Sequence, residues 1–443
     1  MMTEEKINLL TQRLPRYTSY PTAPHFKAID KLSLLESWQQ ELDKTKPISL
    51  YLHIPFCAEM CWYCGCHTKI TKRHEPVEDY VSALISEIEQ TALRLNGKRI
   101  VSHVHFGGGS PTLLEPKEFE RIMEALGTAF TFLGDAEIAI EMDPRTLTEE
   151  KIKAYAMAGV NRASLGVQDI HQHIMEAVGR PQTLQQTQDA CRLLREYGIT
   201  NINFDVMYGF PHQTAKTITD TMHTLAALKP SRIAFFGYAH VPWMKKHMRL
   251  IPEDSLPDTD ARMLLMNTGR NALIERGYVP VGIDHYALPE DDMVKVLKKG
   301  LLKRNFQGYT TDISETLIGF GASSISKYPG GFMQNQPNIG LYKNTITSME
   351  PATVKYCPTT RDDHVRGDII EALMCNYEAY IPEEYDAEKD AIIEKLGKDV
   401  LEWDSITRTL CIIKEGYLWA RVVASTFDAY LKPSPEKKHS AAI

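Results

Sequence analysis

Residues 100–142 read IVSHVHFGGGSPTLLEPKEFERIMEALGTAFTFLGDAEIAIEM, and this stretch carries the pattern that decides the fold. Its two ends, residues 100–106 and 136–142, are short and rich in β-branched or aromatic residues, as strands are. Between them, residues 116–130 place apolar side chains at helical spacing. Two strands joined by one helix predict a βαβ unit with parallel strands and a right-handed crossover.

The same alternation continues on both sides of this unit. Further strand candidates cover residues 48–56, 162–168, 201–208 and 232–238. Helical spacing recurs over residues 77–95, 149–158, 184–197 and 215–228. Six strands alternating with helices predict an α/β fold, which we interpret as an incomplete (β/α)6 TIM-like barrel. Active residues are then expected at the C-terminal ends of the strands.

The flanks of the repeat differ from it in composition. Residues 1–35 include the Pro- and Tyr-rich, aperiodic stretch RLPRYTSYPTAPHF and are predicted to form an N-terminal arm over the core. Residues 36–355 are assigned to the catalytic barrel domain. Residues 356–443 turn helical, with a final apolar helix over 417–431, and are predicted to form a mainly helical C-terminal domain.

Composition excludes several classes of protein. The chain has 443 residues, of which 43% are hydrophobic, so it can bury a sizeable core and is not disordered. Its 50 Lys and Arg against 57 Asp and Glu give a net charge of −7, which argues against binding of duplex nucleic acid. Its apolar runs are too short for a membrane helix, and MMTEEKINLL lacks a signal-peptide pattern. A cytoplasmic protein with no nucleic-acid or membrane partner is expected.

Four of the eight cysteines fall within the ten residues CAEMCWYCGC. The thiols of Cys57, Cys61 and Cys64 can converge from one loop on one metal centre, and a [4Fe–4S] cluster normally takes four thiolates. If only these three bind, one iron stays open to hold and reduce a cofactor. Adding Cys66 would give a four-thiolate zinc site, but structural zinc sites usually use two separated ligand pairs. The remaining cysteines are interpreted as small buried hydrophobes: Cys191, Cys357, Cys375 and Cys411.

The CxxxCxxC triplet, with the aromatic Tyr63 before its last cysteine, resembles the radical S-adenosylmethionine (radical SAM) enzymes. The resemblance implies that Cys57, Cys61 and Cys64 hold a [4Fe–4S] cluster whose open iron is chelated by S-adenosylmethionine. One electron from the cluster then releases a 5′-deoxyadenosyl radical. No catalytic residue beyond the cofactor is implied, because the cofactor carries the chemistry and the protein positions it.

A longer series of motifs resembles one family, the oxygen-independent coproporphyrinogen III oxidases. The motifs include RYTSYPTA at 16–23, SLYLHIPFC at 49–57, HFGGGSPT at 105–112, EIAIEMDPR at 137–145, NFDVMYGFP at 203–211, GYAHVP at 237–242 and RNFQGYTT at 304–311. Cys66 and the first and last of these motifs separate the chain from the haem chaperone relatives. The alternatives are a haem chaperone or another radical SAM tetrapyrrole enzyme on the same fold, either a methyltransferase or a haem-degrading enzyme.

This resemblance implies two bound S-adenosylmethionine molecules. Residues resembling contacts to the first are Tyr51, Tyr63, Gly108, Glu141, Ala239 and Ile325. Residues resembling contacts to the second are Gly109, Ser110, Gln168, Arg180 and Asp205. Glycines after a strand allow backbone to approach a ligand closely, and a guanidinium pairs bidentately with a carboxylate. On their side chains alone, the alanine and the isoleucine would be interpreted as core packing.

The implied reaction converts two propionates of coproporphyrinogen III to vinyl groups, giving protoporphyrinogen IX. A radical is suited to an unactivated C–H bond that no acid or base in a protein can break. Arg16, Arg180 and Arg304 are available to bind the polyanion, although Arg16 and Arg304 could equally be surface or ion-paired residues. An electron donor and an electron acceptor are required, and the sequence identifies neither. A monomer is expected, with the arm and the C-terminal domain covering the open barrel.

Overall fold

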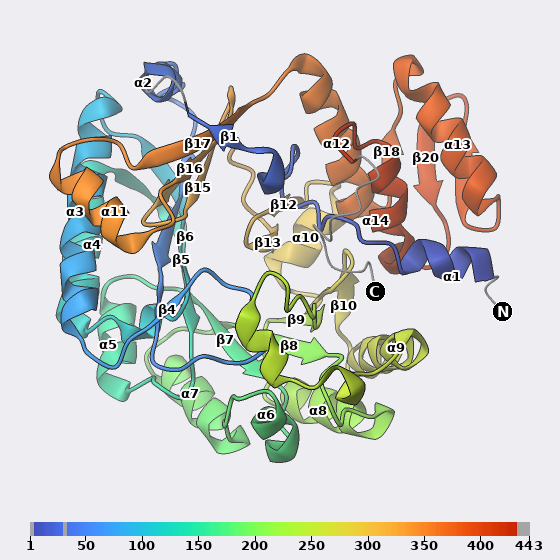
Figure 1. The fold of residues 1–443 in the computed structure, drawn as a ribbon, viewed down its shortest axis with the longest axis horizontal. Helices are drawn as coiled ribbons and strands as arrows, with labels where there is room; N and C mark the ends of the chain where they lie inside the picture. Colours follow the sequence, from blue (N-terminus) through green and yellow to red (C-terminus); the bar gives the residue numbers. More distant parts are fainter. Residues whose placement is uncertain (1–3, 30–32, 432–443) are drawn as a thin grey trace.

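The computed structural model describes residues 4–29 and 33–431. Its centre is a sheet of six consecutive parallel strands, arranged in the order of the chain and curved into part of a barrel (Figure 1). These strands are β2 (Ile48–Ile54), β5 (Ile100–Gly108), β6 (Thr131–Met142), β7 (Arg162–Gln168), β8 (Asn201–Tyr208) and β9 (Arg232–Gly237). The six predicted strands are therefore confirmed, and their ends agree to within a few residues.

Helices cover the outer face of this sheet, as the βα pattern predicted (Figure 1). They are α3 (Glu75–Arg94), α4 (Pro116–Ala129), α5 (Glu149–Met157), α7 (Leu184–Glu196) and α8 (Ala215–Ala227). Threonine starts three of them: Thr148, Thr183 and Thr214 each accept a hydrogen bond from a backbone N–H in the first turn. Such N-caps satisfy donors that a helix leaves unpaired at its start.

The barrel does not close, because its two edge strands pair elsewhere. Beside β2 lies a seventh parallel strand, β14 (Leu317–Phe320), and beyond it an antiparallel series leads outward. That series is β15 (Ile325–Tyr328), β16 (Gly331–Asn335), β17 (Thr353–Pro358) and β1 (Lys27–Ala28). Beside β9 lie β11 (His285–Ala287) and β10 (Val279–Val281). The predicted α/β fold with an incomplete (β/α)6 barrel is thus confirmed within a larger 13-stranded sheet.

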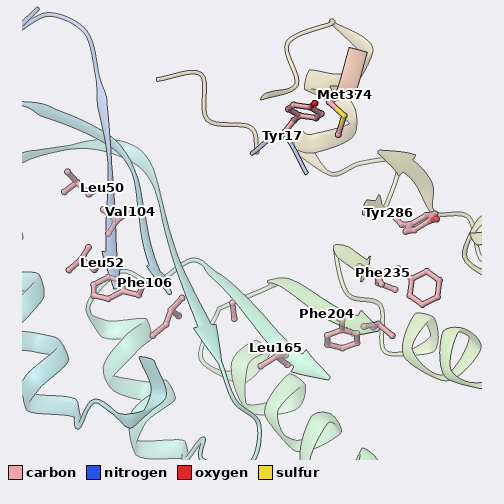
Figure 2. Packing of buried hydrophobic residues seen from close by; sticks show 14 of the residues in the cluster. Tyr17, Leu50, Leu52, Val104, Phe106, Leu165, Phe204, Phe235, Tyr286 and Met374 are labelled. Atoms are coloured by element: carbon pink, nitrogen blue, oxygen red, sulfur yellow. The ribbon is translucent and has the colours of Figure 1, made fainter. Parts of the chain in front are cut away.

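Alternation along the strands gives the sheet one apolar and one polar face. Leu50, Leu52, Val104 and Phe106 lie on the side of the helices, as Figure 2 shows, and each is at most 1% exposed. Successive strand residues point to opposite faces. The intervening residues of β2 and β5, which include Tyr51, His53 and His105, therefore face the barrel interior. An interior lined with polar groups is available for a ligand.

The N-terminal arm and the C-terminal region pack against each other. Helix α1 (Glu4–Leu10) contacts α14 (Gly416–Thr426), near the N-terminal end in Figure 1. Arg421 on α14 donates hydrogen bonds to the carbonyl oxygens of Leu14 and Pro15. The Tyr17 hydroxyl donates to Asp428 at 3.1 Å. The final helix ends at Thr426 and not at residue 431 as predicted.

The C-terminal region is built mainly from α12 (Arg361–Asn376), α13 (Asp386–Leu396) and α14. It also contains a small sheet that the sequence analysis did not anticipate, formed by β18 (Glu378–Tyr380), β20 (Thr409–Ile412) and β19 (Leu401–Asp404). The limits 1–35, 36–355 and 356–443 stay predictions. In the part of the chain that the structure describes, no helix combines the length and the apolar character needed to cross a membrane.

Candidate active site

The cysteine cluster lies on the loop between β2 and α3, at the C-terminal ends of the parallel strands. Cys57 ends the two-residue strand β3 (Phe56–Cys57), which pairs with β4 (Lys69–Ile70) after the loop. The Thr68 hydroxyl donates to Cys57 Sγ at 3.1 Å. The loop is therefore closed at its base, and its cysteines are held over the sheet.

Contacts from other segments fix the tip of this loop. The backbone N–H of Trp62 donates a hydrogen bond to the backbone carbonyl of Val178 at 2.9 Å. His247 Nε2 donates to the Cys64 carbonyl and Lys245 Nζ donates to the Cys66 carbonyl, both at 2.8 Å. These two basic residues follow β9, so the far side of the barrel holds the cysteine loop in place.

A cavity of about 180 Å³ lies beneath the loop, and all four of its cysteines line it. Eight of the eleven predicted cofactor-binding residues line the same cavity: Tyr63, Gly108, Gly109, Ser110, Glu141, Gln168, Arg180 and Asp205. They come from the loop and from the ends of four different strands or the turns that follow them. These segments are far apart along the chain, and the fold brings them to one place.

The other three predicted residues lie outside this cavity. The Tyr51 ring stacks on His105 with centroids 6.0 Å apart, and its hydroxyl hydrogen-bonds to His53 Nδ1 at 3.0 Å. Ala239 lines a second cavity beyond β8 and β9. Ile325 opens β15 and packs against a buried cluster that contains Phe332.

The donor set of the cavity fits an iron–sulfur cluster. Among the residues that the structure describes, no three His, Cys, Asp or Glu side chains converge closely enough to hold a single metal ion. A mononuclear zinc site needs four converging ligands, whereas in an iron–sulfur cluster each thiolate binds a different iron. Three thiols that line one cavity are the kind of donor that such a cluster requires.

The thiol groups are not equivalent. A hydrogen bond with Cys66, opposed by burial, lowers the pKa of Cys64, and the same contact together with burial raises the pKa of Cys66. Burial raises the pKa of Cys57 to about 12. The thiols therefore differ in their surroundings, although all of them line the same cavity.

Two arginines surround Cys61, and sequence reasoning named only one of them. Arg180 Nη1 lies 3.5 Å and Arg145 Nη2 lies 3.7 Å from Cys61 Sγ, and both guanidinium groups also bind Asp143. Burial tends to raise the pKa of Asp143, but the charges and hydrogen bonds of Arg180 and Arg145 outweigh burial and lower this pKa. The sequence analysis did not single out Asp143 or Arg145. Their only signal is that both stand in the quoted motif EIAIEMDPR. The Cys61 sulfur therefore lies against two guanidinium groups that one carboxylate holds in place.

Arg180 was predicted to bind a carboxylate, and its carboxylate partner in this structure belongs to the chain. Besides Asp143, its guanidinium donates to the Gly166 carbonyl at 2.8 Å and to Gln182 Oε1 at 3.1 Å. The residue is 6% exposed. Its donors are engaged, so its geometry is that of a group that holds Cys61 and Asp143.

The glycine run at the end of β5 passes directly under the cysteine loop. Gly108 has φ +117°, and a Cβ there would lie 2.7 Å from the His53 ring. A Cβ on Gly109 would lie 2.6 Å from the carbonyl oxygen of Phe56, which is backbone and cannot yield. Only glycine fits at both positions. The close approach that the glycines permit is therefore, within the chain itself, an approach to the cysteine loop.

Glu141 and Asp205 form an acidic pair on the inner face of the sheet. Glu141 accepts a hydrogen bond from the Gly108 N–H at 3.2 Å and contacts His105 Nε2 at 3.1 Å. Asp205 accepts from the Ser164 hydroxyl at 3.2 Å. Burial and the nearby charge of Glu141 raise the pKa of Asp205 to about 7. Near neutral pH this pair carries less than two negative charges.

Replacing Asp205 with asparagine is expected to change the pH dependence of stability. A carboxyl whose pKa is raised on folding stabilises the fold fully only below its unfolded pKa, and that contribution is lost as pH rises through about 7. Asparagine has no charge to bury. Between pH 5 and pH 8 the variant should gain about 3 kcal/mol in unfolding free energy relative to the parent protein.

Urea unfolding of both cofactor-free proteins at the two pH values measures this difference. Asp135→Asn serves as the control, because Asp135 is an exposed residue of β6 that lines no cavity described above. A constant difference for Asp205→Asn across the range would show that the Asp205 pKa is not raised.

Comparison with known proteins gave consistent matches. The model of the Radical SAM superfamily matches residues 51–225. The oxygen-independent coproporphyrinogen III oxidase of Bradyrhizobium diazoefficiens is 44% identical, over 98% of each chain. That of Paracoccus denitrificans is 39% identical, over 99% of this chain and 98% of the relative. Among solved structures, the radical SAM enzyme coproporphyrinogen III oxidase of Escherichia coli is 33% identical, with a TM-score of 0.89 over 95% of this chain and all of the other.

Proposed function

Because the chain belongs to the family of oxygen-independent coproporphyrinogen III oxidases, we propose that the cavity beneath the cysteine loop is its active site. The protein is a radical SAM oxidoreductase of haem biosynthesis. It oxidatively decarboxylates two propionates of coproporphyrinogen III to vinyl groups, which gives protoporphyrinogen IX. Its cofactors are a [4Fe–4S] cluster and S-adenosylmethionine.

One observation carries the placement of the active site. Three cysteines, eight predicted cofactor contacts and the arginine pair Arg145 and Arg180 line one cavity at the C-terminal ends of parallel strands. Catalytic groups of barrel enzymes gather at this end of the strands. We assign Cys57, Cys61 and Cys64 to the cluster, and the eight residues to two molecules of S-adenosylmethionine.

When bound, the cluster and S-adenosylmethionine supply a 5′-deoxyadenosyl radical that abstracts hydrogen from the unactivated β carbon of a propionate. The residues of the chain bind and orient. Arg145 and Arg180 position the Cys61 sulfur, and Asp143 fixes both guanidinium groups. The Glu141 carboxylate, oriented by Gly108 and His105, is placed to accept from the ammonium or ribose hydroxyls of S-adenosylmethionine.

Exclusion of water is the second task of the chain. The arm that carries Tyr17 is held against α14, and residues of both line a cavity at the ends of β8 and β9. A closed site prevents side reactions of a reactive intermediate. We infer that the arm and the C-terminal region act together as this cover, and that the whole chain works in the cytoplasm, where thiols stay reduced.

The proposed function is tested by an anaerobic assay with coproporphyrinogen III, S-adenosylmethionine and a chemical reductant. Protoporphyrinogen IX and 5′-deoxyadenosine are expected to form together. Formation of 5′-deoxyadenosine without decarboxylation would indicate a different radical reaction, and methyl transfer or loss of haem would identify which. Stoichiometric haem binding without either product would indicate a haem chaperone. An electron donor and acceptor are still required, and a monomer stays a prediction.

A further inference from the structure

A second cavity of about 430 Å³ lies beyond the active-site cavity, at the ends of β8 and β9. Four arginines line it: Arg13 and Arg16 from the N-terminal arm, Arg262 from α9 (Thr259–Glu275) and Arg421 from α14. Segments far apart in the chain thus direct positive charge to one place. Trp243, Leu256 and Met266 supply apolar wall beside the arginines.

Within the described residues, the guanidinium of Arg262 lacks a polar partner. Among residues 4–29 and 33–431, its guanidinium has no hydrogen bond and no ion pair. It makes a cation–π contact with the ring of Tyr208, whose centroid lies 5.8 Å away. Burial lowers its pKa. A half-buried cation without a carboxylate partner is costly, and the described residues supply none, so the site points to an anionic ligand.

Two glycines leave room for this guanidinium. A Cβ on Gly209 would lie 2.5 Å from Arg262 Nη1, and a Cβ on Gly237 would lie 3.2 Å from Arg262 Nη2. Gly209 also has φ +89°, which disfavours any other residue. The chain therefore forms a fitted place for the Arg262 side chain at the cavity wall.

The other charges of the cavity do not neutralise it. Its two carboxylates are occupied: Asp284 pairs with Arg16 at 2.5 Å and with His285, and Asp258 accepts from the N–H of Ala261 at the start of α9. Arg421 donates to backbone carbonyls of the arm. Arg13, at the exposed mouth, lies over the Trp243 ring at 4.7 Å. Four guanidinium groups against two carboxylates leave an excess of positive charge.

Each arginine that the sequence singled out already has a partner within the chain. Arg180 binds Asp143 and Gly166, and Arg16 binds Asp284. Arg304 donates to the Arg16 carbonyl and lies over the Tyr309 ring at 4.4 Å. Arg262 attracted no notice in the sequence, because it stands in an ordinary helical stretch.

We propose that this cavity, through Arg262 with Arg13 at its mouth, binds propionate carboxylates of the tetrapyrrole substrate. The inference rests on the proposed function and adds the place where the substrate is held. The combination of apolar wall and unpaired guanidinium matches a pyrrole ring that carries a propionate. S-adenosylmethionine also has a carboxylate, so the test must separate the two sources. A guanidinium binds a carboxylate bidentately, which lysine cannot reproduce.

The test compares Arg262→Gln and Arg262→Lys holoenzymes with Arg276→Gln, which removes an exposed arginine at the end of the same helix. Fluorescence titration with coproporphyrin III, which keeps the four propionates but does not react, should give a Kd at least about 10-fold higher for Arg262→Gln. Arg262→Lys should fall between, and Arg276→Gln should match the parent. The tetraamide of coproporphyrin III should bind all four proteins alike.

Two further readouts separate this inference from the proposed function. Uncoupled formation of 5′-deoxyadenosine without substrate depends on the active-site cavity, so Arg262→Gln should retain it and the Kd for S-adenosylmethionine. An unchanged Kd for coproporphyrin III would overturn the inference. A weaker affinity of Arg262→Gln for S-adenosylmethionine would also overturn the inference, because it would assign Arg262 to the carboxylate of that cofactor. If Arg262→Gln does not fold, the ratio between Arg262→Lys and the parent decides.

Discussion

Serine in place of Cys57, Cys61 or Cys64, one at a time, is expected to abolish both the brown absorbance of the anaerobically reconstituted protein and its turnover. Iron–sulfur clusters are held by thiolates, and a serine hydroxyl is not ionised at neutral pH. The three thiols line one cavity and occupy the loop that β3 and β4 close. Iron and sulfide content and activity measure the result.

The other cysteines provide the controls. Cys66→Ser should keep the cluster, because the resemblance to the radical SAM enzymes assigns its ligands to Cys57, Cys61 and Cys64. Cys191→Ser tests the mere loss of a thiol, since Cys191 is 2% exposed and lies in the core on α7. The isolated cysteines were all interpreted as buried, which holds for three of them but is wrong for Cys411, a half-exposed residue of β20. A fully loaded cluster in any of the three single variants would contradict the ligand assignment.

Removing the Glu141 carboxylate is expected to have the next largest effect. Glu141→Ala should lower turnover and uncoupled 5′-deoxyadenosine formation by roughly 100-fold or more, while iron and sulfide content stay unchanged. The carboxylate is fixed from two sides by Gly108 and His105, so it is oriented before any ligand binds. Its loss removes an acceptor and a negative charge from the cavity that also contains the three cysteines.

Glu141→Gln separates these two contributions. Glutamine keeps an oxygen for the Gly108 N–H but has no charge, so an intermediate loss would assign part of the effect to attraction of the ammonium group. Glu124→Gln, on the exposed face of α4, is the matched control. Full S-adenosylmethionine binding by Glu141→Ala, measured by equilibrium dialysis, would remove Glu141 from the cofactor site.

The sequence predicted the barrel strands because each has strong alternation or continuous apolar character and a clear boundary. Strand β7 was predicted to the residue, at 162–168. The strands beyond β2 were missed, since β14, β15 and β16 are five residues or shorter and carry little pattern of their own. Such short strands form because a neighbouring strand offers unpaired backbone groups, which is information that lies elsewhere in the chain.

For the candidate site, motifs identified residues but not their partners. Arg180 was predicted to bind the carboxylate of a ligand, yet its guanidinium binds the carboxylate of Asp143. Asp143 and Arg145 were not predicted as site residues, although both stand in the motif EIAIEMDPR. Arg262 had no motif at all. In each case the missing information was a contact between segments that are distant in sequence.

The sequence by itself determined the order of strands and helices, the three thiols on one short loop and the family resemblance, because these depend on local spacing and on residue type. Tertiary structure alone decided which side chains share a cavity, which arginines are already paired and where an uncompensated positive charge remains. Those properties depend on distances between strand ends, and only the curvature of the sheet and the packing of the arm on α14 fix them. The eight cysteines illustrate both parts, since spacing marked three of them and burial separated the rest.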